Sequence, residues 1–165
     1  MKALDFRNDV LPLKDKIFRL ALRITLNRAE AEDITQETLI RVWQQRDEWH
    51  QIENIEAYSL TIARRLGIDH VRKGKEEGLG ERDDVACAPE TLPDAQLEKR
   101  QRMEIVQRII NTLPETWRTI MTLRDIEGYR YEEIAQMTDL TETQVKVYLH
   151  RARSRVKQAL TTQIP

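Results

Sequence analysis

The chain has 165 residues, of which 33% are charged and 5% aromatic, with a formal net charge of −1 and five Gly. This composition predicts a soluble, mostly helical protein of one or two small domains. No apolar run approaches the ~20 residues of a membrane-spanning helix, and the N-terminus lacks the apolar stretch of a signal peptide. We therefore expect a cytoplasmic protein without direct membrane insertion. Cys87 is the only cysteine, which excludes an intramolecular disulfide and a thiolate zinc cluster.

Chain-breaking residues divide the sequence into two parts. Three of the five Gly and two of the five Pro fall between Gly74 and Asp94, where no helical apolar period survives. The stretch 74–95 carries two basic and seven acidic residues, a balance of −5, whereas 1–73 comes to +1 and 96–165 to +3. The prediction is an all-α protein in which a three-helix bundle (1–73) and a four-helix bundle (96–165) are joined by a flexible acidic linker (74–95).

Apolar spacing predicts the helices of the first bundle. The pattern i, i+3, i+4, i+7 marks one face of a helix, and it appears at Ile17, Leu20, Ala21 and Ile24. A second helix begins around 28–30, has acids in its first turns, and should carry Leu39, Val42 and Trp43 inward. Residues 47–54 have no period and are expected to form a loop, and a third helix follows over 55–73.

The same spacing predicts the start of the second bundle. It recurs at Val106, Ile109, Ile110 and Leu113, and Pro114 ends that helix. Another helix begins near residue 117 and ends near Gly128. These apolar residues are expected to form the core.

The segment from Tyr131 onward has the pattern of a helix-turn-helix. A short helix over 131–137 precedes a turn at 138–140 and a second helix that opens at Thr141. Thr141 and Gln144 form a capping box, which satisfies amide donors at a helix start. Ala135 is small where the two helices cross, and Asp139 tolerates a left-handed backbone in the turn.

A basic, outward-facing arc on the second helix predicts DNA binding. Residues 140–165 contain five Lys or Arg and one acidic residue, a net charge of +4. In a helix-turn-helix this arc lies in the major groove, and positive charge gathers where phosphates are met. A solvated basic face is the alternative for a lone helix. The residues predicted to contact duplex DNA are Thr143, Lys146, Val147, His150, Arg151 and Arg153.

Two stretches together resemble a known family. Residues 31–43 (AEDITQETLIRVW) followed by 56–72 (EAYSLTIARRLGIDHVR) resemble the first module of bacterial sigma-70-type factors, and 113–153 resembles the other. The short length, with only a linker between the modules, is similar to the extracytoplasmic-function (ECF) group, and the likeness covers about 150 of the 165 residues. Arg130, Asp139 and Tyr58-Ser59 depart from the family pattern, which bears on promoter sequence rather than on function.

The resemblance implies that the chain binds core RNA polymerase and directs promoter-specific initiation. The second helix would dock on the β′ clamp through Asp33, Gln36, Glu37 and Arg41, and the second module would also meet the β flap. The helix-turn-helix would read the minus-thirty-five element as duplex. The loop and third helix would recognise and melt the minus-ten element, with Trp49, His50 and Asn54 on a flipped base and Arg64 and Arg65 on phosphates. An ordinary polar loop with one half-buried Trp is the alternative for the loop.

The resemblance also implies an anti-sigma factor as a partner, often membrane-anchored in this family, and neither cofactor nor metal. Three other classes of protein fit the sequence less well. A sigma mimic that sequesters its regulator would not need the base-reading arc, and an ordinary helix-turn-helix repressor leaves the first bundle unexplained. An enzyme is disfavoured because the three His are scattered and no Gly-rich phosphate loop or metal-ligand spacing appears.

Overall fold

The computed structural model describes residues 3–76 and 94–163, and within those ranges the chain is helical with no strand. Module one contains two short helical turns, η1 (Phe6–Val10) and η2 (Leu11–Leu13), then α1 (Lys14–Thr25), α2 (Arg28–Gln44), the 3-10 helix η3 (Arg46–Gln51) and α3 (Ile55–Glu76). Module two contains α4 (Asp94–Asn111), α5 (Glu115–Met121), η4 (Thr122–Ile126), α6 (Tyr131–Thr138) and α7 (Glu142–Gln163). The all-α prediction is confirmed. Most of the predicted linker, with Cys87, lies outside the described residues.

Local signals end the helices where the sequence predicts. Leu26 turns the chain after α1 with a left-handed backbone (φ 54°), and the Asn27 side chain then accepts a hydrogen bond from the Glu30 amide at 3.0 Å to start α2. Pro114 separates α4 from α5. The predicted loop at 47–54 is largely a 3-10 helix, because its turns close with short i to i+3 bonds such as Glu48 N–H to the Gln45 carbonyl.

The first bundle buries the residues that the spacing indicates, with one exception. Ile17, Leu20, Ala21 and Ile24 are at most 1% exposed. The expectation that Trp43 faces inward is wrong, because 45% of this residue is exposed while Val42 beside it is fully buried. Trp43 instead contacts Phe6 edge-on, with ring centroids 5.3 Å apart. Phe6 belongs to η1, so the segment before α1 packs beside the exposed end of α2.

The helix-turn-helix is capped as the sequence predicts. The Thr141 amide donates to Gln144 Oε1 at 2.9 Å and the Gln144 amide donates to Thr141 Oγ1 at 3.1 Å, a reciprocal pair that starts α7. Asp139 takes the left-handed conformation (φ 58°) in the turn. At the start of α6, Glu133 Oε1 accepts from the Arg130 backbone amide at 3.4 Å and from Arg130 Nε at 2.8 Å, so a carboxylate three residues on supports a start that lacks a hydroxyl cap.

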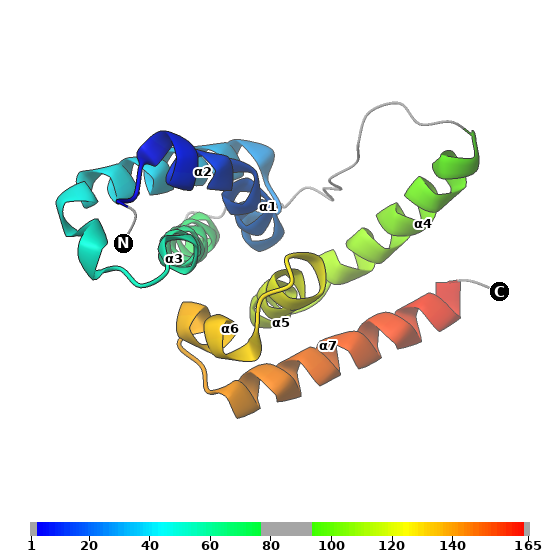
Figure 1. Cartoon of the computed structure of the whole chain (residues 1–165). Helices are drawn as coiled ribbons and strands as arrows, with labels where there is room; N and C mark the ends of the chain where they lie inside the picture. The colour runs from blue at the N-terminus through cyan, green and yellow to red at the C-terminus, as the bar shows by residue number, and fades with distance from the viewer. Residues whose placement is uncertain (1–2, 77–93, 164–165) are drawn as a thin grey trace.

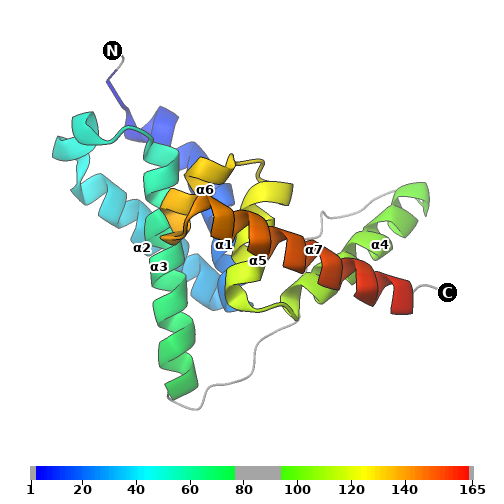
Figure 2. The same ribbon diagram turned by 90° about the horizontal axis from the view of Figure 1, so that it is seen from below.

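The two modules pack against each other through one continuous core. Ile24 of α1, Ile120 of α5 and Ile134 of α6 belong to a single buried cluster. Helix α1 contacts α5, and α6 lies beside α3 in both views of the chain (Figures 1 and 2). Helices α4 and α7 extend away from module one (Figure 1). The helix-turn-helix half of the chain is therefore placed directly against the first bundle.

A buried guanidinium joins the modules at this contact. Arg118 on α5 donates through Nε to the Arg23 carbonyl at 2.8 Å and through an Nη to the Ile24 carbonyl at 3.0 Å, both at the end of α1. The other Nη donates to the Leu113 carbonyl at 2.8 Å. These bonds satisfy carbonyl oxygens that a helix end leaves without an intrahelical partner. A buried charge is tolerated when it is hydrogen-bonded in this way.

Arg118→Met should lower the free energy of unfolding by about 3 kcal/mol, because each buried carbonyl left without a donor costs about 1–3 kcal/mol. Urea denaturation followed by circular dichroism measures the change. Arg155→Met is the matched control, since Arg155 is exposed and stacks over the Trp117 ring at 4.7 Å. An equal loss for both variants would show that Arg118 stabilises only through its aliphatic stem.

Candidate nucleic-acid interface

One face of α7 is buried and the other is free to meet DNA. Val145, Leu149 and Ala152 are at most 1% exposed and fix the helix against the core. The opposite face carries every residue that the sequence predicts for duplex contact, and all of them are exposed. This recognition face consists of Thr143, Lys146, Val147, His150, Arg151 and Arg153. A helix held on one side and polar on the other suits insertion into a major groove.

Cations from several elements converge beside the recognition face at Tyr131. Arg124 lies over the Tyr131 ring at 4.5 Å and Lys146 over the same ring at 5.4 Å. Arg153 forms two hydrogen bonds with the Asp125 carboxylate, one of them from Nε at 3.0 Å. These bonds to Asp125 raise the pKa of Arg153 and keep the guanidinium charged. Arg124 and Tyr131 were not predicted, because their proximity to α7 depends on how η4 and α6 fold back on it.

The three loop residues predicted to hold a flipped base differ in burial: Trp49 is buried, whereas His50 and Asn54 are exposed. Trp49 is 7% exposed, and its Nε1 donates to the Val42 carbonyl at 2.9 Å, so its ring lies inside the loop. His50 is exposed. Asn54 is also exposed, and its Oδ1 accepts from the Ala57 amide at 3.1 Å to start α3. The loop is therefore supported from within by the Trp and presents its His and Asn outward.

The two arginines of α3 differ as well. Arg64 is partly buried, and its Nε is buried without a hydrogen-bond partner among the described residues. Arg65 is exposed and lies 3.7 Å from the Asp139 carboxylate in the turn of module two. Such an exposed pair contributes little stability in water. The Arg65 guanidinium is therefore readily available to another anion.

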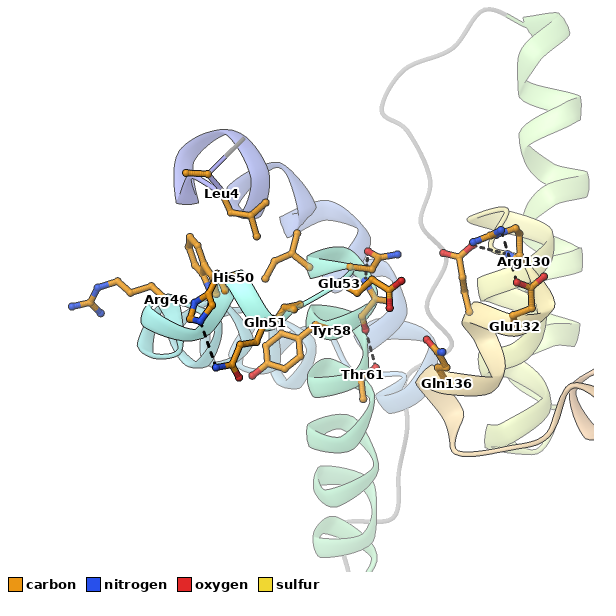
Figure 3. A pocket seen from close by; sticks show the side chains of 17 residues that line it. Leu4, Arg46, His50, Gln51, Glu53, Tyr58, Thr61, Arg130, Glu132 and Gln136 are labelled. Carbon is orange, nitrogen blue, oxygen red and sulfur yellow. Dashed lines mark hydrogen bonds and ion pairs between the residues drawn. The ribbon is translucent and has the colours of Figure 1, made fainter. Parts of the chain in front are cut away.

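A cavity of about 1300 Å³ separates this loop from module two. In Figure 3, His50, Tyr58 and Thr61 lie on one side and Arg130, Glu132 and Gln136 of the α6 region on the other. Arg130 pairs with Glu133 at 2.8 Å and lies 3.8 Å from Glu132. Polar and apolar side chains both line this cavity, and its α6 wall carries the carboxylates Glu132 and Glu133.

A second exposed face runs along α2. Asp33 and Gln36 are exposed, and Glu37 pairs with Arg41 one turn on at 2.8 Å. Ile40 and Trp43 continue the same face at i+4 and i+7 from Gln36, and they are 55% and 45% exposed. Sequence reasoning missed these two because apolar residues at helical spacing are core by default. Their spacing of four and seven residues from the polar Gln36 was the sequence signal that could have indicated their exposure.

Within the described ranges, no helix is long and apolar enough to cross a membrane, and no group of His, Cys, Asp and Glu could hold a metal ion.

The fold and these faces define a two-module helical protein with a helix-turn-helix at the end of its second module. Residues 10–77 match the model described as sigma-70 region 2, and residues 103–156 match sigma-70 region 4. The ECF RNA polymerase sigma factor SigW of Bacillus subtilis is 30% identical over 89% of this chain and 84% of its own length. The chain belongs to the ECF group of sigma-70-type RNA polymerase sigma factors.

Two other similar proteins are also sigma factors. ECF sigma factor SigE of Mycolicibacterium smegmatis is 32% identical over 88% of this chain, and the chain spans only 58% of its length. The solved structure of sigma factor RpoE from Bartonella quintana, in complex with the anti-sigma factor NepR, matches 95% of this chain and 97% of its own with a TM-score of 0.79 at 23% identity. At that identity the match shows the shared fold.

Trp49→Ala should lower the free energy of unfolding by about 3–5 kcal/mol, the usual cost of emptying a buried aromatic site. Trp43→Ala is the matched control and should cost less, about 1–2 kcal/mol, because nearly half of Trp43 faces solvent while its ring keeps edge contacts with Phe6 and Trp49. Thermal or urea unfolding of both variants decides the matter. Comparable losses would mean that the two rings share the burial attributed to Trp49.

Proposed function

We propose that this chain binds core RNA polymerase and directs promoter-specific transcription initiation as an ECF-type sigma factor. The observation that carries the proposal is the presence of sigma-70 regions 2 and 4 on one chain, with a recognition helix whose predicted DNA-contacting residues are all exposed. This role needs no catalytic group, and it places the protein in the cytoplasm with the polymerase. The repressor and mimic alternatives each leave one of the two modules without a task.

In this proposal the recognition face reads the minus-thirty-five element as duplex. Lys146, Val147, His150 and Arg151 span a little over one turn, so their side chains reach adjacent base edges. Thr143 sits in the first turn, where the helix enters the groove. Arg124 lies beside Lys146 over Tyr131 and adds a cation for the phosphate backbone.

The loop of module one and α3 take the minus-ten element as a single strand. His50 and Asn54 face outward and supply a ring and an amide for an unstacked base, while Trp49 holds the loop in shape from inside. Arg64 and Arg65 supply phosphate contacts. A rigid loop of this kind fixes where the strand must pass, which is what strand capture requires.

The face along α2 docks on the β′ clamp. Its polar residues are Asp33, Gln36, Glu37 and Arg41, and we add the exposed Ile40 and Trp43 as its apolar centre. Aromatic side chains at the centre of an interface commonly supply much of the binding free energy, and the surrounding polar residues set the register. Module two meets the β flap. An anti-sigma factor is the expected regulator, in keeping with the NepR complex of the related fold.

Run-off transcription with purified core polymerase on a promoter library tests this function. The full chain should initiate from a defined subset of promoters, whereas 1–76 and 94–165 alone should not, because each supplies only part of the DNA and polymerase contact. A repressor would bind duplex DNA without polymerase and start no transcript. Specific transcription from either half alone would contradict the two-module proposal.

Arg151→Ala should cost about 1–3 kcal/mol at the preferred upstream element and relax the preference at one base pair, the worth of a bidentate Arg–guanine contact. Arg153→Ala should weaken all promoters alike and reduce the salt dependence by about one phosphate contact, since Arg153 lies farther along the helix. Binding across single-base variants of the upstream element measures both effects. A uniform loss for Arg151→Ala, or a base-specific one for Arg153→Ala, would mean another docking register.

A further inference from the structure

A segment at the start of module one packs under the loop that presents His50 and Asn54. We call residues 3–10 the support segment and residues 46–54 the capture loop. Val10 is fully buried in a small apolar cluster with Val42 of α2 and Trp49 of the loop, and Leu4 and Phe6 pack against the same cluster. The buried residues of this cluster are distinct from those of the continuous core. Residues 3–9 also lie before the part of the chain that matches sigma-70 region 2, so that match gives them no role.

The capture loop is built from short-range bonds. Most of it is the 3-10 helix η3, in which the Glu48 amide donates to the Gln45 carbonyl at 2.9 Å and the Ile52 amide donates to the Trp49 carbonyl at 3.0 Å. Turns of this kind have poorer hydrogen-bond geometry than an α-helix. The η1 turn of the support segment contacts both α2 and α3, the helices at which the loop begins and ends. The support segment therefore bridges the two ends of the loop.

Three aromatic rings connect the support segment to the inside of the capture loop. Phe6 meets the Trp43 ring edge-on, with centroids 5.3 Å apart, and Trp43 meets Trp49 edge-on at 6.4 Å. Trp49 is fixed in turn by the hydrogen bond from its Nε1 to the Val42 carbonyl at 2.9 Å. Edge-on pairs of this kind are favourable beyond the area they bury. Removal of the Phe6 ring therefore loosens Trp43, and through Trp43 the ring that fills the loop.

The support segment holds its own shape through a closed set of polar bonds. The Asp5 amide donates to Asp9 Oδ2 at 2.7 Å, and the Asp9 amide donates to the Asp5 carbonyl at 2.8 Å. Asn8 Nδ2 donates to the Asp5 carboxylate at 2.7 Å. Phe6 and Val10 are four residues apart within this turn and share the face that meets α2. The segment is thus an ordered turn with its apolar side toward the loop.

The support extends to the residues proposed to hold the unstacked base. Ala3 and Leu4 line the same cavity as His50 and Asn54. Leu4 lies on the loop side of that cavity, with His50 and across from Arg130 (Figure 3). His50 directly follows Trp49, so a shift of the buried ring moves the His50 backbone with it. A binding group is effective only when the residues behind it fix its position.

We propose that the support segment is a positioning element for strand capture: Phe6 holds Trp43 against Trp49, and Leu4 and Val10 close the cluster beneath the loop. His50 and Asn54 are then presented in their binding arrangement before the strand arrives. Phe6 acts through the loop and is a positioning residue, because its ring packs on Trp43. The proposal rests on the proposed function for the identity of the strand, whereas the order of the loop is measured on the protein alone.

The first experiment measures the order of the capture loop by amide hydrogen exchange in the full chain. Phe6→Ala should speed exchange of the Glu48 and Ile52 amides about fivefold to tenfold, the fold-change that corresponds to one aromatic pair. Phe18→Ala is the matched control, because Phe18 is also partly exposed but packs against the continuous core. It should leave exchange in the loop unchanged. Loop exchange in Phe6→Ala equal to that of the original chain would overturn the proposal.

The second experiment measures strand capture with core polymerase at saturating concentration. The probe is a fluorescein-labelled twelve-nucleotide strand with the minus-ten sequence that the promoter library selects. Phe6→Ala should weaken strand binding by the same factor by which loop order falls, because only ordered loops bind. It should leave binding of the duplex upstream element unchanged. Phe6→Tyr keeps the ring and should restore strand binding, and Phe18→Ala should leave it intact.

A double-mutant cycle with His50→Ala separates positioning from stability. His50→Ala removes one group that the loop presents, so Phe6→Ala should weaken strand binding less in that background than in the original chain. An equal effect of Phe6→Ala in both backgrounds would overturn the proposal, and so would equal weakening of strand and duplex binding. Thermal unfolding confirms that each variant is folded. If the library yields no promoter, the proposed function fails instead, and the exchange experiment still decides whether the support segment orders the loop.

Discussion

The buried guanidinium of Arg118 ties the two halves of this protein together. Arg118 is only 9% exposed, and a cation at that burial is tolerated only when its donors are used. Two of its acceptors are the carbonyls of Arg23 and Ile24 at the end of α1, in the other module. Helix α1 must therefore end where it does, with Leu26 in a left-handed turn, for module two to dock. The continuous core follows from that fixed geometry.

Several arginines near the predicted nucleic-acid surfaces already lie beside carboxylates of the same chain. Arg153 binds Asp125, Arg65 lies near Asp139, and Arg130 pairs with Glu133. The exposed Arg65–Asp139 pair contributes little stability in water, whereas the two hydrogen bonds from Arg153 to Asp125 hold that guanidinium more firmly. The internal partners keep each guanidinium oriented. The recognition face is nevertheless basic, because residues 140–165 hold five Lys or Arg and one acid in a chain whose net charge is −1.

Much of the fold could be predicted because its signals are local. The Thr141–Gln144 capping box and the left-handed Asp139 involve residues within one turn of each other, and both were expected from the sequence. The sequence could not predict that Trp49 is buried and Trp43 partly exposed. Which of the two rings is buried depends on the position of Phe6 and on the path of η3. The packing of the two modules against each other could not be predicted from local sequence signals either. Glu56 and Tyr129 are 73 residues apart, and helical periodicity carries no information about their meeting.

The continuous core sets an energetic cost on any separation of the two modules. Separation of the modules exposes side chains such as Ile24, Ile120 and Ile134 to the extent that each is covered by the other module, and fully exposing one such side chain costs about 1.5–3 kcal/mol. Any partner that binds the two modules apart from each other must offset that cost. The recognition face and most of the α2 face are exposed while the modules are packed together, so a partner can reach either face without separating them. A chain whose modules stayed apart would expose a contiguous apolar surface to solvent, so the polar contacts of Arg118 that hold the modules together also keep the shared core covered.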